Sequence, residues 1–225
     1  MYQYKTLSNG IKVVAEKIDY LKSISIGVWV GNGSRYENKE VNGISHFIEH
    51  MLFKGTKNRS ASQIAHEINT VGGQLDAFTS REYTCFYTKT LDSHIPIALE
   101  ILSDMLYNPS LSPDDMALER QVIKEEIRMY EDSPEDLVYD LSSYAAWGDT
   151  PMGRTILGTY ESLDGITPDI MRNYMNNHYT SANTIISVSG NFDDTFFELL
   201  EKYFGTKKML DTKPYLPDAP YISKN

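Results

Sequence analysis

The sequence predicts an α+β fold in which a mostly antiparallel β-sheet packs against several helices. Candidate strands and helices come in blocks and do not alternate as strict β-α-β units, which favours antiparallel pairing. An Asn-Gly pair near the N-terminus is typical of a β-hairpin. The 225 residues, 41% of them hydrophobic, suffice to bury a full core, so the chain is long enough for one large domain or two small ones.

The first part of the chain is expected to form a hairpin and a third strand. Residues 2–7 and 11–17 flank Asn9-Gly10, a pair that supplies the positive φ angles of a tight two-residue turn. Residues 23–30 alternate apolar and small side chains, which predicts the next strand. A glycine-containing loop then leads to a short apolar helix.

A second helix and two more strands follow. Ser60 is a suitable N-cap for a helix through Val71, and a glycine pair ends that helix. Residues 74–79 and 83–90 are rich in aromatic and β-branched side chains and therefore predict two strands.

Three helices are expected in the middle of the chain. The first is an amphipathic segment over residues 92–107, which an Asn-Pro pair stops. Ser112 and Ser133 each begin a further helix, because proline and acidic residues occupy the first turn after each serine. We expect these two helices to reach residues 131 and 147.

The last third of the chain is expected to hold one strand and two helices. Residues 148–163 contain glycine and proline and are predicted to be a loop. We expect a helix over residues 167–178, a strand over 182–189 and a last helix over 193–204.

Charge and composition exclude several classes of partner. The net charge is −10, from 31 acidic and 21 basic residues, and no run rich in lysine or arginine occurs. We therefore expect no nucleic-acid partner and no membrane partner. The chain starts without an apolar signal core, has no run of about 18 apolar residues, and contains one cysteine. These features predict a cytoplasmic, reducing location.

Two histidines in the short apolar helix have the spacing of metal ligands. His46 and His50 are four residues apart and therefore lie on one helix face, where two imidazoles can reach one ion. Glu49 lies about 60° around the helix from His46, so its carboxylate can face the same ion. The alternative is a buried helix with satisfied core histidines, but burying three titratable groups unpaired costs several kcal/mol. The His-x-x-Glu-His pattern is the inverted zinc-protease motif.

A third ligand is needed, because a catalytic zinc ion usually takes three protein ligands. A helical wheel at about 100° per residue places Glu119 and Glu126 inside the apolar stripe of the helix from Ser112, and Glu125 on the opposite side. The other members of that predicted stripe are Met116, Val122, Ile123, Ile127 and Tyr130. Either the two buried carboxylates pair with lysine or arginine, or one binds the metal while the other orients a ligand imidazole. The residues alone leave both interpretations open.

The spacing of these residues resembles the zinc-ligand pattern of the pitrilysin, insulin-degrading enzyme and mitochondrial processing peptidase family. Glu126 follows His50 after 75 residues, and Glu119 lies seven positions before Glu126. Other segments are similar to the bacterial processing-peptidase branch of the family: residues 7–10, 33–37, 50–56, 72–75, 82–84, 153–154 and 157–159. The similarity extends from Leu7 to about Asn191.

The resemblance implies a fold, a cofactor and an activity. The fold would be one metallopeptidase half-domain, the processing-peptidase-like roll. One Zn2+ ion per chain would be held by His46, His50 and Glu126, with Glu119 supporting a ligand imidazole. Glu49 would be the general base of a zinc-dependent endopeptidase that hydrolyses short or unfolded peptides.

The resemblance also implies how a peptide substrate binds. In relatives, the strand that matches residues 74–79 pairs with an extended peptide beside the zinc, so the expected substrate-binding residues are Asp76, Ala77, Phe78 and Thr79. The family usually has asparagine where this chain has Asp76. An aspartate that faces the cleft would favour peptides with basic residues near the scissile bond, and the alternative is an ordinary strand-end aspartate.

Family members are usually longer and consist of two similar halves, and this chain resembles the first, metal-binding half. We therefore expect a zinc-binding peptidase domain over residues 1–208 and the start of a linker toward a C-terminal half over residues 209–225. The partner would be that C-terminal half or a homologous subunit, in a possible dimer. The isolated chain is expected to bind zinc and to cleave peptides poorly.

Two alternative functions stay open. Some family members are non-catalytic scaffold subunits, but these typically lose motif residues, whereas Glu49 and every ligand are present here. A zinc lyase of the same superfamily takes cysteine as its third ligand, which would be Cys85. A free cysteine in a strand is, however, usually just a buried core residue.

Overall fold

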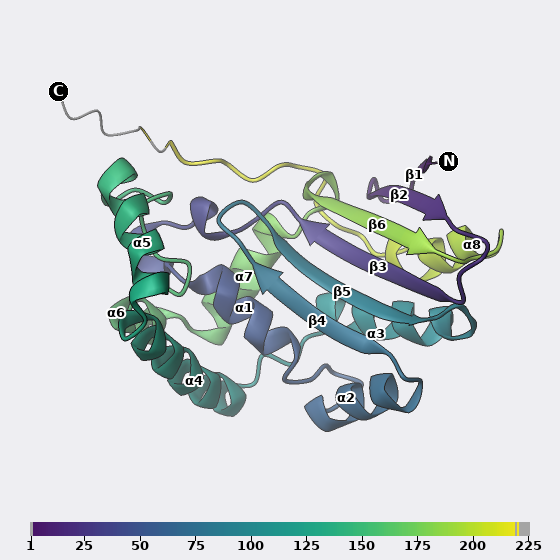
Figure 1. Cartoon of the computed structure of the whole chain (residues 1–225), viewed down its shortest axis with the longest axis horizontal. Helices are drawn as coiled ribbons and strands as arrows, with labels where there is room; N and C mark the ends of the chain where they lie inside the picture. The colour runs from purple at the N-terminus through teal and green to yellow at the C-terminus, as the bar shows by residue number, and fades with distance from the viewer. Residues whose placement is uncertain (1, 219, 221–225) are drawn as a thin grey trace.

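A six-stranded sheet with the order β1-β2-β6-β3-β5-β4 forms the centre of the computed structural model, which describes residues 2–218 and 220 (Figure 1). Every neighbouring pair is antiparallel except β2 and β6, which are parallel. The predicted α+β fold with a mostly antiparallel sheet is therefore confirmed. The strands are β1 Tyr2–Thr6, β2 Lys12–Lys17, β3 Ser23–Val30, β4 Gln74–Thr79, β5 Thr84–Leu91 and β6 Thr184–Gly190.

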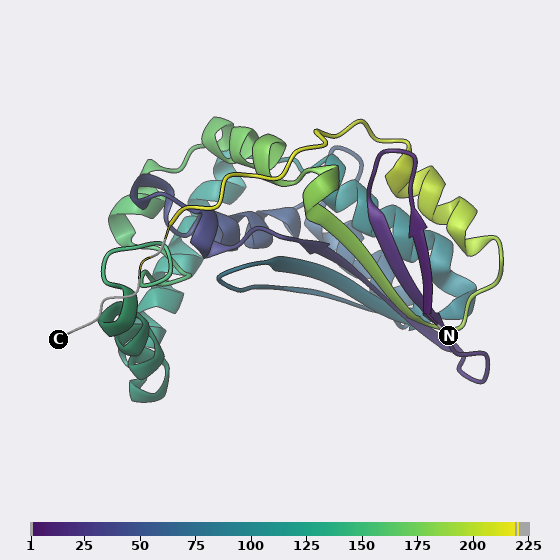
Figure 2. The same ribbon diagram turned by 90° about the horizontal axis from the view of Figure 1, so that it is seen from above.

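Helices cover one face of the sheet and leave the other face open (Figure 2). Helices α4 and α5 continue past the β4 side of the sheet, so the molecule is concave on its open face. The helices are α1 Ile44–Leu52, α2 Ala61–Thr70, α3 Ile95–Tyr107, α4 Pro113–Glu131, α5 Pro134–Trp147, α6 Tyr160–Gly165, α7 Pro168–His178 and α8 Phe196–Leu200, which continues as one π-helical turn over Glu201–Gly205.

Several predicted elements have the predicted bounds, because local capping and turn signals define their ends. Strands over residues 23–30 and 74–79 are confirmed. The side chains of Ser112 and Ser133 accept hydrogen bonds from backbone N–H groups three residues later, so α4 and α5 begin where predicted. Both helices also end at the predicted residues, 131 and 147. Ser60 forms a full capping box with Gln63 at the start of α2.

Two local predictions are wrong. The first hairpin has no two-residue turn: Leu7 N–H donates to the Ile11 carbonyl, and of the turn pair only Gly10 has a positive φ, +99°. The segment predicted as a loop over residues 148–163 ends in helix α6, because Thr159 forms a capping box with Ser162.

The last helix also differs from its prediction. It begins at Phe196 rather than at residue 193, and Asp193 caps the turn before it through its bonds to Thr195. The strand predicted at 182–189 starts at Thr184, after one 3-10 turn. Both differences lie at element ends, where fraying makes sequence signals weakest.

The core lies between the covered face of the sheet and helices α1, α3 and α7. Alternate side chains of β3 point into it, while Trp29 points to the open face. Helix α1 is surrounded: five of its apolar side chains are completely buried, namely Ile44, Phe47, Ile48, Met51 and Leu52. This packing fixes the rotation of α1 about its axis and with it the directions of its two histidines.

Among the residues that the structure describes, every helix is too short or too polar to cross a membrane.

Candidate metal centre

A buried carboxylate fixes the N-terminus of helix α1. Glu37 is fully buried, and its oxygens accept hydrogen bonds from Gly43 N–H at 2.7 Å, Ser45 N–H at 2.9 Å and the Asn42 side-chain amide at 3.0 Å. Gly43 has a φ of +92°, and a Cβ there would meet the Leu157 carbonyl oxygen at 2.6 Å. The start of the histidine helix therefore has little freedom to shift.

Three predicted metal ligands converge at one point. Oε2 of Glu126 on α4 lies 3.7 Å from His46 Nε2 and 3.6 Å from His50 Nε2. One ligand atom from each of the three side chains lies within 4.8 Å of the other two, so together they could hold a metal ion. A tetrahedral zinc ion with bonds of about 2.0–2.1 Å separates its ligand atoms by roughly 3.3 Å. The two measured separations exceed that value by only a few tenths of an ångström.

The donor chemistry fits zinc. His46 Nδ1 is buried and has no hydrogen-bond partner among the described side chains. Burial and the neighbouring His50 lower the pKa of His46 to about 3, so its imidazole stays neutral at neutral pH. Zinc requires neutral imidazole and ionised carboxylate ligands, and two histidines with one glutamate are a common zinc set.

The predicted supporting residue, Glu119, contacts one of the ligands. Its Oε2 lies 3.0 Å from His50 Nδ1, and the side chain is only 8% exposed. An Nδ1–H that donates to this carboxylate leaves the Nε2 lone pair of His50 available to a metal ion. The other carboxylate oxygen, Oε1, lies 2.7 Å from the Nζ of Lys54.

Glu49 lies between the histidines and strand β4. Its Oε2 accepts a hydrogen bond of 2.5 Å from the Thr79 hydroxyl. Burial raises the pKa of Glu49 above its ordinary value, and the bond from Thr79 partly offsets that rise. A carboxylate with a raised pKa is suited to accept and return a proton near neutral pH.

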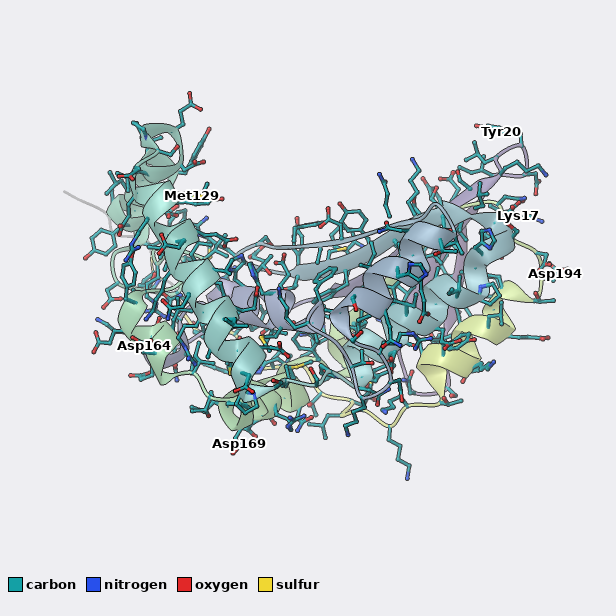
Figure 3. All side chains as sticks on the ribbon, turned by 90° about the horizontal axis from the view of Figure 1, so that it is seen from below. Lys17, Tyr20, Met129, Asp164, Asp169 and Asp194 are labelled. Atoms are coloured by element: carbon teal, nitrogen blue, oxygen red, sulfur yellow. The ribbon has the colours of Figure 1, made fainter. Side chains whose placement is uncertain are left out.

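A cleft of about 250 Å³ opens beside these groups. His46 and Glu49 of α1 line it together with Ala77 and Thr79 of β4. Tyr130, at the end of α4, and Asp140 of α5 also belong to its lining. In Figure 3, Met129 marks the end of α4, where the chain turns toward α5.

Strand β4 is the last strand of the sheet at the cleft. It pairs with β5 alone, so its other edge has no strand partner within the described part of the chain, although the Ala77 N–H donates to the Asp76 carboxylate at 2.8 Å. Phe78 belongs to an aromatic cluster with Trp29 on the open face, with ring centroids 5.8 Å apart. Asp76 accepts a hydrogen bond of 3.2 Å from the Tyr87 hydroxyl, and its charge contributes to the raised pKa of Glu49.

The structure also corrects the helical wheel. The buried stripe of α4 includes Glu119 but not the whole predicted face: Glu126 is 34% exposed, Val122 43% and Tyr130 46%. The reason is that α4 packs on α1 along one narrow stripe, and its C-terminal half borders the open cleft. Glu126 therefore reaches the histidines from the rim of the site.

Other residues of the site were not predicted from the sequence. Lys54 is one of them, although it lies four residues after His50, a spacing that places side chains near each other on a helix and its extension. Cys85 is buried in β5 and is not part of the possible metal group of the described residues.

Comparisons with known proteins identify the family of this chain. The chain matches the sequence pattern described as "Insulinase (Peptidase family M16)" over residues 12–160 and that described as "Peptidase M16 inactive domain" over residues 165–225. It is similar to an uncharacterized zinc protease, YmxG, of Bacillus subtilis, with 47% identity over 92% of this chain and 50% of that protein. A probable mitochondrial-processing peptidase subunit beta of Arabidopsis thaliana is 40% identical over 82% of this chain and 35% of its own length.

A solved structure has the same fold. A protease from Helicobacter pylori superposes with a TM-score of 0.89 and 28% identity, covering 98% of this chain and 54% of that one. This chain spans about half the length of curated relatives such as YmxG. The matching family pattern and these relatives show that the chain belongs to the insulinase family of zinc proteases, peptidase family M16.

Proposed function

We propose that this chain provides the metal site and the general base of a zinc-dependent endopeptidase. The observation that carries the proposal is the convergence of His46, His50 and Glu126, with one ligand atom from each within 4.8 Å of the others and Glu49 on the same helix as both histidines. The zinc-protease names of its relatives support the same class of activity.

In this proposal His46, His50 and Glu126 hold one zinc ion. Glu119 orients His50 by accepting a hydrogen bond from its Nδ1, the ring nitrogen that does not bind the metal. When bound, zinc would supply Lewis-acid chemistry, polarising a peptide carbonyl and making water acidic enough to react near neutral pH. The chain's own contribution is a set of ligands held by two helices, of which α1 is packed against the core on several sides.

Glu49 is the proposed catalytic residue. Thr79 holds its Oε2, which leaves Oε1 to take the proton from the attacking water. The same carboxyl then gives that proton to the leaving amine, so the carboxylate is restored at the end of the reaction. Partial burial supports this role, because it brings the pKa of Glu49 closer to neutral pH.

The open edge of β4 supports an extended peptide as substrate. A peptide can add to this edge as a further strand, with backbone hydrogen bonds to residues 76–79, and its scissile bond would then lie beside Glu49. We propose Asp76, Ala77, Phe78 and Thr79 as the substrate-binding residues. A folded protein offers few unpaired extended segments, so short or unfolded peptides are the proposed substrates.

The proposed organisation follows from the length of the relatives. We propose that residues 1–208 form the peptidase domain and that residues 209–225 begin a linker. The partner would be a C-terminal half or a homologous subunit, since the chain spans about half of its relatives and one of them is named as a subunit. The isolated chain would then be weakly active or inactive. A cytoplasmic location remains a proposal from composition alone.

Metal analysis and a quenched peptide test the proposal. The wild-type protein, in its longest natural form, should bind one zinc ion and cleave the peptide. Glu49→Gln should retain zinc and lose about 10²- to 10⁴-fold in rate, the usual contribution of a general base. Glu40→Gln, at an exposed position before α1, is the matched control and should cleave normally. A wild-type enzyme no faster than Glu49→Gln would contradict the peptidase assignment and favour a scaffold role.

A further inference from the structure

Lys54 lies at the outer end of a row of three side chains that leads to the metal site. Its Nζ is 2.7 Å from Glu119 Oε1, and Glu119 Oε2 is 3.0 Å from His50 Nδ1. Lys54 is 35% exposed, whereas Glu119 is 8% exposed. The row therefore connects a charged group near the surface with a metal-ligand imidazole.

Glu119 needs a cation, because a buried carboxylate that shares an imidazole, His50, with a second carboxylate, Glu126, is costly. Among the ion pairs of the described residues, Lys54 is its one lysine or arginine partner. The next two cations on α4 are committed elsewhere: Arg120 donates to the carbonyls of residues 163 and 166, and Lys124 pairs with Asp164.

The two oxygens of Glu119 have different partners, so Lys54 sets which oxygen faces His50. Without the ammonium group on Oε1, the carboxylate would be free to rotate or to turn toward solvent. His50 would then lose the acceptor that orients its Nδ1–H. His46 has no comparable support, since its own Nδ1 has no hydrogen-bond partner among the described residues.

The backbone around Lys54 is held in place. Lys54 N–H donates to the Met51 carbonyl at the end of α1. The next residue, Gly55, has a φ of +119°, and a Cβ there would meet the Arg59 carbonyl oxygen at 2.9 Å. This turn returns the chain tightly after α1, so the lysine side chain starts from a fixed point.

We propose that Lys54 is a positioning residue of the zinc site: it holds the Glu119 carboxylate in the orientation that directs His50 Nε2 toward the metal. This inference rests on the proposed zinc site and adds to it a residue that touches neither metal nor substrate. Such outer partners of metal ligands typically change metal affinity by roughly 10- to 100-fold.

Zinc affinity, measured by competition with a chromophoric chelator, tests the proposal on the full chain. Lys54→Met should weaken zinc binding by roughly 10-fold or more. Lys54→Arg should restore affinity to within about threefold, because arginine can also donate to Oε1. Lys57→Met, at an exposed position three residues later, is the matched control and should bind zinc like the wild type.

A double variant separates positioning from a general structural effect. If Lys54 acts through Glu119, the double variant that carries both Glu119→Gln and Lys54→Met should bind zinc with the same affinity as the single variant Glu119→Gln. Thermal unfolding of the metal-free variants checks that each is folded, and Lys54→Gln replaces Lys54→Met if the latter is not. Two results overturn the inference. One is a Lys54→Met variant that binds zinc as tightly as the wild type. The other is a double variant whose zinc affinity falls below that of Glu119→Gln by as much as Lys54→Met lowers it in the wild type. Absence of zinc binding by the wild type would instead refute the metal site itself.

Discussion

The hydroxyl of Thr79, on the edge strand β4, donates a 2.5 Å hydrogen bond to Oε2 of Glu49, on the histidine helix α1. This bond joins the proposed substrate-binding strand to the proposed general base. A peptide added to β4 would therefore be placed relative to Glu49 by a direct contact. It also leaves one defined oxygen of Glu49, Oε1, available for proton transfer.

Removing that bond should shift the acid side of the pH profile of kcat/KM. Protonated Glu49 cannot accept a proton, so activity falls as pH drops through its pKa. That pKa is already raised by burial, and Thr79 lowers it. Thr79→Val should therefore move the acid limb to higher pH by roughly one unit, since a hydrogen bond to a charged group contributes about 1.5 kcal/mol or more. Thr79→Ser keeps the hydroxyl and should leave the limb in place; an unmoved limb in Thr79→Val would show that the bond has no role in activity.

Glu126 and Glu125 form a matched pair for testing the third ligand. Glu126 lies at the two histidines, whereas Glu125 pairs with Arg128 at the surface. Glu126→Gln should weaken zinc binding by more than about 100-fold, because a ligand contributes more than an outer partner does. Glu125→Gln should bind zinc like the wild type in the same chelator competition. Equal affinities for the two variants would remove Glu126 from the ligand set.

Cys85 should be chemically inert in the folded chain. Burial raises the pKa of its thiol to about 12, so almost no thiolate is present at pH 8. A thiol reagent should label Cys85 only after unfolding, and Cys85→Ala should retain the zinc affinity of the wild type. A large loss of zinc in Cys85→Ala would instead support the lyase alternative, in which cysteine is a ligand.

Glu37 should contribute strongly to the stability of the metal-free chain. Its carboxylate accepts from two backbone N–H groups and from Asn42, and a glutamine side chain would replace one accepting oxygen by an NH2 group, which can only donate. Glu37→Gln should lower the free energy of unfolding by about 2–4 kcal/mol, measured from urea midpoints. Glu40→Gln, which is exposed, should change it by less than about 0.5 kcal/mol. A similar small change in both variants would mean that Glu37 does not fix the start of α1.

Local signals predicted the secondary structure well where a cap or a turn defines an element. The serines before α4 and α5 are examples, since each accepts the expected N–H bond. The same kind of signal, Thr159 with Ser162, was present before α6, but glycine and proline in the preceding segment concealed it.

Features that depend on distant parts of the chain could not be predicted from a local pattern. The wheel could not show that Tyr130 faces an open cleft, because that depends on where α1 and α5 lie. Lys54 pairs with Glu119, 65 positions later in the sequence, and the four-residue spacing from His50 indicates only that Lys54 lies near that imidazole. The meeting of His46, His50 and Glu126 was predictable because the family spacing links them; their roles in binding metal stay a prediction.

The place of β6 in the sheet has a consequence for how the chain acquires its structure during translation. Strand β6 lies between β2 and β3, so it alone joins the N-terminal hairpin to the remaining strands. A nascent chain that has not yet released residues 184–190 from the ribosome holds two separate sheet fragments, although every proposed zinc ligand has already been synthesised. Long-range pairing of this kind raises contact order and slows folding, so final assembly of the sheet must wait until synthesis of the domain is nearly finished.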